Sequence, residues 1–199
     1  MSDQAKLSLT GAILAGGRSS RLGRDKACVE IAGRSMLARA VEAVRPLACE
    51  ILVVGRAQLE PSTRGIRCLP DERPGLGPMG GLLTALDAAS HERVLCLACD
   101  MPLVTTRILQ RLAQVTEDAD AVALRSGDRV EPLCAIYHRR IRPVVRERVA
   151  QGLLAMHELL EAVRTTYVEL DPTDQQLVFN VNTPEDLARA ERLVQEMKR

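Results

Sequence analysis

A loop near the amino terminus combines glycines with positive charge. Leu14 is followed by Ala15, Gly16 and Gly17, and residues 14–26 contain three glycines and four basic side chains, Arg21 and Lys26 among them. Glycines let backbone N–H groups approach anionic oxygens, and cations can neutralise a polyphosphate. The pattern predicts a phosphate-binding loop, although an exposed basic turn is the alternative for this loop taken alone. No Walker A register fits it.

Asp100 is the carboxylate whose setting is most informative. It follows the apolar run 94–99 and precedes Met101-Pro102, so it is expected at the carboxyl end of a central strand. A carboxylate there can hold Mg²⁺ while phosphate oxygens and water complete the coordination. The alternative is an acid that caps the following helix.

A second glycine-rich segment, Gly75 to Gly80, fits G-x-G-x-x-G, and Asp100 lies twenty residues further on. That spacing suggests a dinucleotide fold. Pro74 and Pro78, however, remove two backbone donors, and residues 71–73 separate the glycines from the preceding strand. We therefore predict a rigid loop that lines a substrate site, with a plain connector as the alternative.

Nucleophile and metal patterns are weak. Cys96 and Cys99 have C-x-x-C spacing but lie within the apolar run, where strand positions three apart face opposite sides. A buried-core role is favoured over a zinc or redox role. Ser19 and Ser35 lack the last glycine of G-x-S-x-G, and H-E-x-x-H is missing.

Short apolar runs alternate with amphipathic segments, and together they must position these residues. The runs predict strands buried on both faces, whereas residues 36–47 and 187–197 have helical spacing. Thr183 caps the last helix, with Pro184, Glu185 and Asp186 in its first turn. The expected strands are 9–14, 51–54, 66–69, 94–99 and 119–124.

This alternation predicts an α/β fold with a doubly wound, mostly parallel sheet and helices on both faces. An antiparallel excursion is expected where residues 125–128 turn into 130–137. In such folds ligands bind beyond the carboxyl ends of the strands.

The composition of the chain limits the classes of function that it can have. The 199 residues suit a single domain over 1–199, and 27 Lys+Arg against 26 Asp+Glu give a net charge of +1. Neither this balance nor the few aromatic residues favours nucleic-acid binding. No uncharged apolar stretch reaches the roughly 18 to 20 residues of a membrane span. Six scattered cysteines and the absence of a convincing signal sequence predict a cytoplasmic protein.

Taken together, five ordered segments resemble the molybdenum cofactor guanylyltransferases, a branch of the nucleotidyltransferases with a Rossmann-like fold. The family's L-A-G-G-x-S-x-R-M-G-x-D-K signature occurs here with Leu22 in place of Met. The resemblance spans most of the chain. The five segments are Leu14 to Lys26, Pro70 to Pro78, Cys99 to Pro102, Glu131 to Leu133 and Asn180 to Asp186.

The resemblance implies a reaction and assigns residues to it. GMP would be transferred from GTP to the terminal phosphate of molybdenum-molybdopterin, releasing pyrophosphate, without a protein nucleophile. Arg21, Lys26 and Asp100 would serve catalysis, and Asp100 would also bind Mg²⁺. The nucleotide would be held by Leu14, Ala15, Gly16, Gly17, Lys26, Asp71 and Asp100.

The resemblance also divides the chain. Residues 1–105 would mainly bind the nucleotide and 106–199 would form the pterin side. Asn180 and Asn182, two apart in an extended segment, would point the same way and help to seat the pterin with their amides. The alternative for Asn182 is a turn residue before the Thr183 cap. Transient contact with molybdoenzymes or their chaperones would follow.

One departure and three rivals remain. Family members often carry Asn at the end of the second strand, where this chain has Val54-Gly55-Arg56. A CTP-dependent cytidylyltransferase for the same pterin is the nearest rival, but that branch typically reads L-A-A-G where this chain has L-A-G-G. An NAD(P)-dependent oxidoreductase and a non-catalytic nucleotide sensor are the others.

Overall fold

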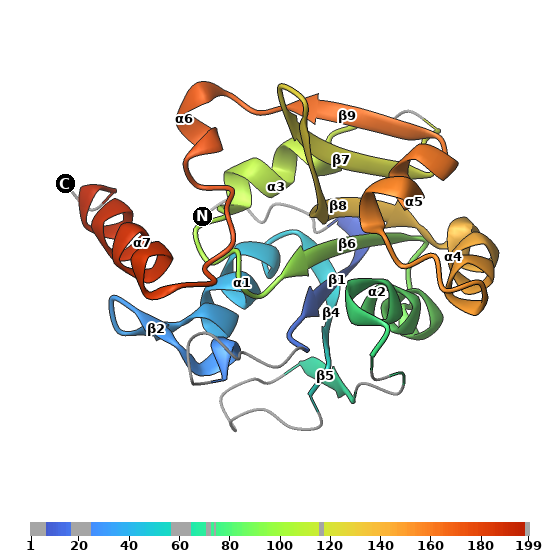
Figure 1. The fold of residues 1–199 in the computed structure, drawn as a ribbon, viewed down its shortest axis with the longest axis horizontal. Helices are drawn as coiled ribbons and strands as arrows, with labels where there is room; N and C mark the ends of the chain where they lie inside the picture. Colours follow the sequence, from blue (N-terminus) through green and yellow to red (C-terminus); the bar gives the residue numbers. More distant parts are fainter. Residues whose placement is uncertain are drawn as a thin grey trace.

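The computed structural model describes residues 7–16, 25–56, 65–70, 73, 75–115 and 118–197. A mixed sheet of seven strands in the order β5-β4-β1-β6-β8-β7-β9 forms its centre (Figure 1). The strands of this sheet are β1 (Leu7–Leu14), β4 (Ala48–Val54), β5 (Ile66–Leu69), β6 (Arg93–Ala98), β7 (Ala121–Ser126), β8 (Arg129–His138) and β9 (Thr165–Glu169).

Helices and a small hairpin surround the sheet. The hairpin is β2 (Glu30–Ile31) and β3 (Arg34–Ser35), and it follows the 3-10 turn η1 (Lys26–Cys28). The other elements are α1 (Met36–Val44), α2 (Gly77–Ala88), α3 (Thr106–Ala113), η2 (Arg139–Ile141), α4 (Arg142–Ala150), α5 (Met156–Ala162), α6 (Pro172–Gln175) and α7 (Pro184–Glu196).

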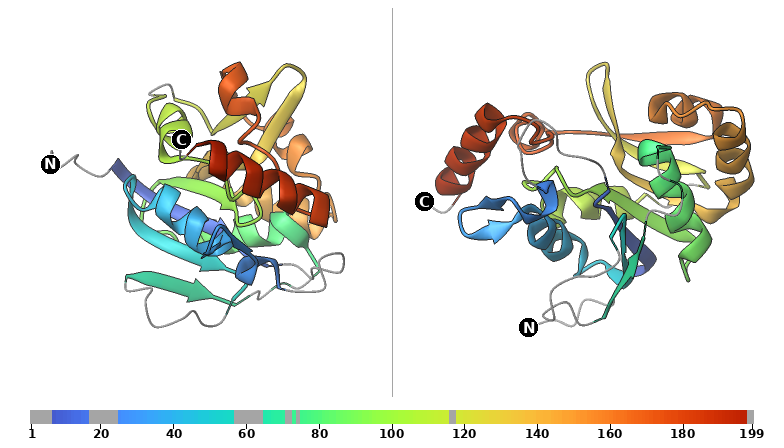
Figure 2. Two further views of the ribbon diagram at one scale, coloured as in Figure 1. Left: turned by 90° about the vertical axis from the view of Figure 1, so that its left-hand side faces the viewer. Right: turned by 60° about the horizontal axis from the view of Figure 1, so that its bottom comes forward.

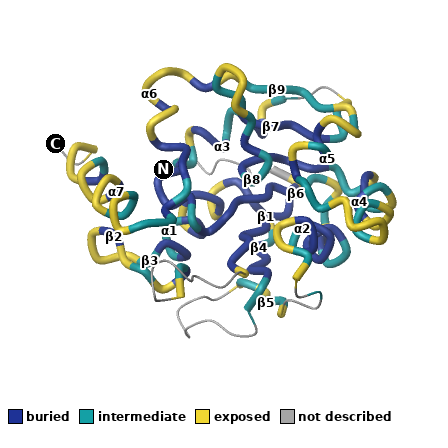
Figure 3. Tube along the Cα trace, viewed as in Figure 1, coloured by how far each residue is buried: buried dark blue, intermediate teal, exposed yellow. Residues whose placement is uncertain are grey.

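Two apolar cores lie on the two faces of the sheet. Helices α1, α3 and α7 contribute to one core, and α2, α4 and α5 contribute to the other. The views from two further directions separate these layers (Figure 2), and β1, β4 and β6 are buried along most of their length (Figure 3). Strands covered on both faces read as continuous apolar runs, which explains why β1, β4 and β6 were recognisable in the sequence.

The register of the parallel strands aligns three strand ends. Leu14 at the end of β1 pairs with Val54 of β4 on one side and with Ala98 of β6 on the other. From β1 the chain passes through α1 to β4, and it later returns through α2 to β6, with the two helices on opposite faces. A crevice therefore opens beyond β1, as expected where strand order reverses.

The fold prediction is confirmed, including its antiparallel excursion. Strand β8 pairs antiparallel with both β6 and β7, and the β7–β8 turn contains Gly127 at φ 58°. Thr183 caps α7 in a capping box with Asp186. The sequence analysis did not identify β9, the β2–β3 hairpin or helices α3 to α6. No helix among the described residues is long and apolar enough to span a membrane.

Gly11 sets how closely α1 approaches β1. A Cβ on Gly11 would lie 2.2 Å from Val44 Cγ1 and 3.3 Å from the Ala48 Cβ. Both neighbours are buried, and Val44 is stiff at χ1. Because Gly11 has no side chain, α1 can pack directly against β1, the strand whose carboxyl end borders the crevice.

We predict that Gly11→Ala lowers the free energy of unfolding by roughly 1–3 kcal/mol, the usual cost of overpacking a core. Urea denaturation measures this change. In a Val44→Ala background the main clash is gone, so the same substitution should cost less than half as much. Equal costs in both backgrounds would show that the contact with Val44 does not limit the packing.

Candidate functional site

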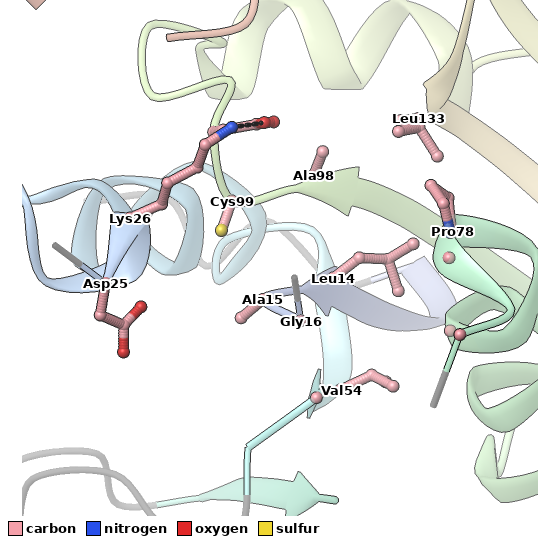
Figure 4. Close-up of a pocket in the computed structure, with 15 residues that line it drawn as sticks. Leu14, Ala15, Gly16, Asp25, Lys26, Val54, Pro78, Ala98, Cys99 and Leu133 are labelled. Carbon is pink, nitrogen blue, oxygen red and sulfur yellow. Dashed lines mark hydrogen bonds and ion pairs between the residues drawn. The ribbon is translucent and has the colours of Figure 1, made fainter. Parts of the chain in front are cut away.

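A cavity of about 430 Å³ lies at the carboxyl edge of the parallel strands. The ends of β1, β4 and β6 form its floor, and the start of α2 forms one wall (Figure 4). Its lining residues are Leu14, Ala15, Gly16, Asp25, Lys26, Val54, Gly55, Gly75, Gly77, Pro78, Gly81, Ala98, Cys99, Asp100 and Leu133. The structure thus brings together five residues expected to bind nucleotide, namely Leu14, Ala15, Gly16, Lys26 and Asp100.

Lys26 and Asp100 form an ion pair at this cavity. Lys26 Nζ lies 3.0 Å from Asp100 Oδ2, and the two side chains are 24% and 18% exposed. Lys26 is the first residue of η1. Asp25 caps this turn, because its side chain accepts a hydrogen bond from the Ala27 amide. Asp100 directly follows the β6 end and the Cys99 turn residue. A cation and a carboxylate therefore meet where the two segments converge on the crevice.

Asn180 and Asn182 point to the same side, as the extended spacing predicted, and they reach this ion pair. The Asn180 amide Nδ2 donates to Asp100 Oδ1 at 2.9 Å. Lys26 Nζ donates to Asn182 Oδ1. Four polar side chains thus converge, and they come from three separate parts of the chain.

The backbone that carries these amides is itself fixed. The Val181 amide donates to the Asp100 carbonyl at 2.8 Å, and the Val181 side chain is fully buried. Asp186 accepts from the amides of Asn182 and Thr183 at 3.0 and 2.9 Å. The Asn182 amide is the main reason that the pKa of the Asp186 carboxyl is lowered. The first turn of α7 therefore anchors the segment over Asp100.

The departure at the second strand has a structural counterpart. Val54 and Gly55 both line the cavity, whereas Arg56 donates to the Asp25 carboxylate. Asp25 therefore joins η1 to the end of β4. Neither Asp25 nor Val54 was among the residues expected to bind a ligand, although Asp25 belongs to the first sequence motif.

Gly16 and Gly55 make a close backbone approach below the cavity. Gly55 has φ 96°, and a Cβ there would lie 2.5 Å from both Cα and N of Gly16. The Ala15 amide also donates to the Val54 carbonyl at 2.8 Å. Only glycine satisfies both the conformation and the contact, so this pair fixes the start of the first loop.

Cys96 and Cys99 are core residues on opposite sides of the sheet, as predicted. They belong to the two different cores, and burial raises the pKa of each thiol to about 12. Cys99 borders the cavity, but its thiol stays protonated at neutral pH and is a poor nucleophile.

The glycine segment after β5 lines the cavity, in agreement with its predicted role. Gly75 and Gly77 have φ 92° and 56°, and α2 begins at Gly77 with Pro78 in its first turn. Leu76, the N-cap residue of α2, makes no side-chain capping hydrogen bond. Gly17, Arg21 and Asp71 lie outside the described residues, so their assigned roles stay predictions.

The donor set suits a hard cation that is shared with a ligand. Asp100 presents carboxylate oxygens, which Mg²⁺ prefers. Among the described residues, no group of three or more His, Cys, Asp or Glu side chains could hold a metal ion. Asp25, the other carboxylate that lines the cavity, is paired with Arg56. Asp100 alone would leave most coordination positions to nucleotide oxygens and water, so it fits Mg²⁺ bound together with a nucleotide.

Comparison with known proteins decides the family. The model of the MobA-like NTP transferase domain matches residues 11–169. The chain belongs to this family. Two relatives, from Carboxydothermus hydrogenoformans and Vibrio parahaemolyticus, are named probable molybdenum cofactor guanylyltransferase and molybdenum cofactor guanylyltransferase. They are 35% and 32% identical, and each alignment covers 89% of this chain and 92% of the relative.

Solved structures support the same fold for this MobA-like transferase. Molybdopterin-guanine dinucleotide biosynthesis protein A from Archaeoglobus fulgidus matches with a TM-score of 0.79 and 26% identity, over 94% of this chain and all of that one. The 2-C-methyl-D-erythritol 4-phosphate cytidylyltransferase from Thermus thermophilus matches with a TM-score of 0.74 at 22% identity, over 95% and 100%. The second likeness concerns the fold alone.

We predict that Gly55→Ala in this MobA-like transferase destabilises the fold and distorts the cavity. The strained φ costs about 1–2 kcal/mol, and the collision with Gly16 adds to it. Gly33→Ala is the matched control, because Gly33 also has a positive φ of 76° but open space around a Cβ. Gly55→Ala should lower the melting temperature and the affinity for nucleotide clearly more than Gly33→Ala does. Similar effects of both variants would contradict a role for the Gly16–Gly55 contact.

Proposed function

We propose that this chain transfers GMP from GTP to the terminal phosphate of molybdenum-molybdopterin and releases pyrophosphate. The single observation that carries the proposal is the Lys26–Asp100 ion pair in a cavity at the ends of β1 and β6. The family match and the names of the relatives support the guanylyl rather than the cytidylyl reaction. They also favour a nucleotidyltransferase over an NAD(P)-dependent oxidoreductase.

The described residues account for how the nucleotide would be held. Leu14, Ala15 and Gly16 offer backbone at the end of β1, and Lys26 offers positive charge for the phosphates. The amino end of α2 adds the positive end of a helix dipole, although Pro78 in its first turn offers no N–H. Gly17, Arg21 and Asp71 would complete the set, since they lie in the sequence close to Gly16, Asp25 and Gly75, which line this cavity.

The reaction would proceed by alignment. An oxygen of the pterin phosphate attacks the α-phosphorus of GTP, a new P–O bond forms, and the bond to the β-phosphate oxygen breaks. Lys26, and Arg21 beside it in the sequence motif, would neutralise charge on the triphosphate. Mg²⁺ is the proposed cofactor: held by Asp100 and phosphate oxygens, it would supply further charge neutralisation.

The pterin side is proposed to lie against the second half of the chain. Most cavity-lining residues fall within residues 1–105, whereas Leu133 and the segment 180–182 approach from 106–199. We place the molybdopterin beside this segment, so that its phosphate reaches the nucleotide. The product would pass to molybdoenzymes or their chaperones. The buried thiols of Cys96, Cys99 and Cys134 suit a reducing cytoplasm.

The direct test is pyrophosphate release with each of the four nucleoside triphosphates, with and without molybdenum-molybdopterin. We expect release only with GTP, the pterin and Mg²⁺ together. Asp100→Ala should lower the rate about 10²- to 10³-fold, the common cost of losing one preorganised electrostatic contact. Release with CTP would favour the cytidylyl reaction, and no release with any nucleotide would favour a sensor.

A second prediction concerns Lys26. Lys26→Ala should weaken GTP binding by roughly 10-fold or more while hardly affecting GMP, because a cation that serves the β- and γ-phosphates finds neither in GMP. Lys26→Arg should restore only part of the affinity, since a planar guanidinium replaces a compact ammonium. Calorimetric titration measures each affinity.

Arg34→Ala is the control for a lost positive charge, because Arg34 pairs with Glu42 on the surface and does not line the cavity. It should leave both affinities unchanged. Equal weakening of GTP and GMP by Lys26→Ala would place the ammonium away from the outer phosphates.

A further inference from the structure

The amides of Asn180 and Asn182 make opposite kinds of hydrogen bond to the two charges of the site. Asn180 donates its N–H to the Asp100 carboxylate at 2.9 Å. Asn182 offers its oxygen to the Lys26 ammonium. Each amide thus presents the end that suits its charged partner.

The two Asp100 oxygens are thereby made unequal. Oδ1 receives the Asn180 bond, whereas Oδ2 lies 3.0 Å from Lys26 Nζ. If a bound triphosphate drew Lys26 to its oxygens, Oδ2 would be freed to accept a cation. Oδ1 would keep its Asn180 partner, which would hold the plane of the carboxylate.

The support beneath the amides makes this orientation well defined. Val181, between them, is buried and bonds to the Asp100 carbonyl, and Asp186 holds the Asn182 backbone. Outer partners of a metal-binding carboxylate typically change metal affinity 10- to 100-fold. Asn180 and Asn182 occupy that place with respect to Asp100 and Lys26.

We propose that Asn180 and Asn182 are positioning residues for the nucleotide and its metal: Asn180 orients the Asp100 carboxylate, and Asn182 orients the Lys26 ammonium. The inference rests on the proposed function and deepens it. It differs from a role in seating the pterin, because both amides act through groups on the nucleotide side of the reaction. The carboxy-terminal segment would thereby complete the GTP site.

The test measures binding in the absence of the pterin, so that no transfer takes place. GTP is titrated calorimetrically into the full-length protein with and without Mg²⁺. Asn182→Ala should weaken GTP binding about 10-fold under both conditions, through Lys26. Asn180→Ala should leave Mg²⁺-free binding unchanged but raise the Mg²⁺ concentration needed for tight GTP binding about 10-fold or more.

Double-mutant cycles separate positioning from general damage to the fold. Asn182→Ala should have little further effect on GTP affinity in a Lys26→Ala background, and Asn180→Ala little further effect on the Mg²⁺ requirement in an Asp100→Ala background. The isosteric Asn180→Asp removes the donor and faces Asp100 with a second carboxylate, so it should be at least as harmful as Asn180→Ala. Glu185→Ala, at an exposed neighbouring position, is the matched control and should change neither affinity.

Two results would overturn the inference while leaving the proposed function intact. One is unchanged Mg²⁺ and GTP binding together with a raised KM for the pterin, which would return the amides to pterin binding. The other is equal weakening of GTP binding by Asn182→Ala in wild-type and Lys26→Ala backgrounds, which would indicate a lowered stability of the segment. Failure of the wild-type protein to bind GTP would instead contradict the proposed function itself.

Discussion

The ion pair between Lys26 and Asp100 is the interaction around which the site is arranged. Lys26 and Asp100 lie 74 residues apart in the sequence. Asn180 lies 80 residues after Asp100, to which it bonds, and Asn182 lies 156 residues after Lys26, from which it accepts a bond. Both charged side chains are mostly removed from water. A desolvated pair of this kind contributes little net stability. The pair matters because of where it lies. It holds the Lys26 ammonium and the Asp100 carboxylate side by side at the cavity, where the phosphates of a substrate could pair with the ammonium and a cation could pair with the carboxylate.

The topology of the sheet determines where Lys26 and Asp100 come together. Parallel pairing of β1 with β4 and β6 aligns their ends, and the helices that follow β1 and precede β6 leave on opposite faces. Among the described residues, those that follow β1 and β6 and the start of α2 border the strand ends at that point. Two glycine contacts then set the distances: Gly11 admits α1 against β1, and Gly55 admits the backbone of Gly16. The phosphate-binding role proposed for the first loop would therefore depend on the packing at Gly16, where the loop starts, as well as on its positive charge.

The sequence allowed the central strands, the capped last helix and five of the cavity residues to be predicted, because each has a local signal. Apolar runs mark β1, β4 and β6, and the Thr183–Asp186 capping box is visible in four consecutive residues. Strand β9 has a weaker signal, since its residues are only half-buried and lie at the sheet edge. The bonds from Asn180 to Asp100 and from Arg56 to Asp25 have no local signal at all. They arise from tertiary packing, which brings together residues that the sequence keeps far apart.

Catalysis by position accounts for the remaining features of the site. The Cys99 thiol beside the cavity has a pKa of about 12, so burial excludes it as a nucleophile at neutral pH. Around the Lys26–Asp100 pair, the described residues offer a carboxylate, an ammonium and two amides whose directions are fixed by hydrogen bonds. A single carboxylate binds a divalent cation weakly by itself, whereas the cation and a triphosphate bound together satisfy each other's charge. In the proposed function, metal and nucleotide binding would then be coupled, and the segment 180–182 would favour that coupling because Asp186 fixes the backbone of Asn182. The surroundings of Lys26 thus depend on the last helix of the chain, through Asn182 and Asp186.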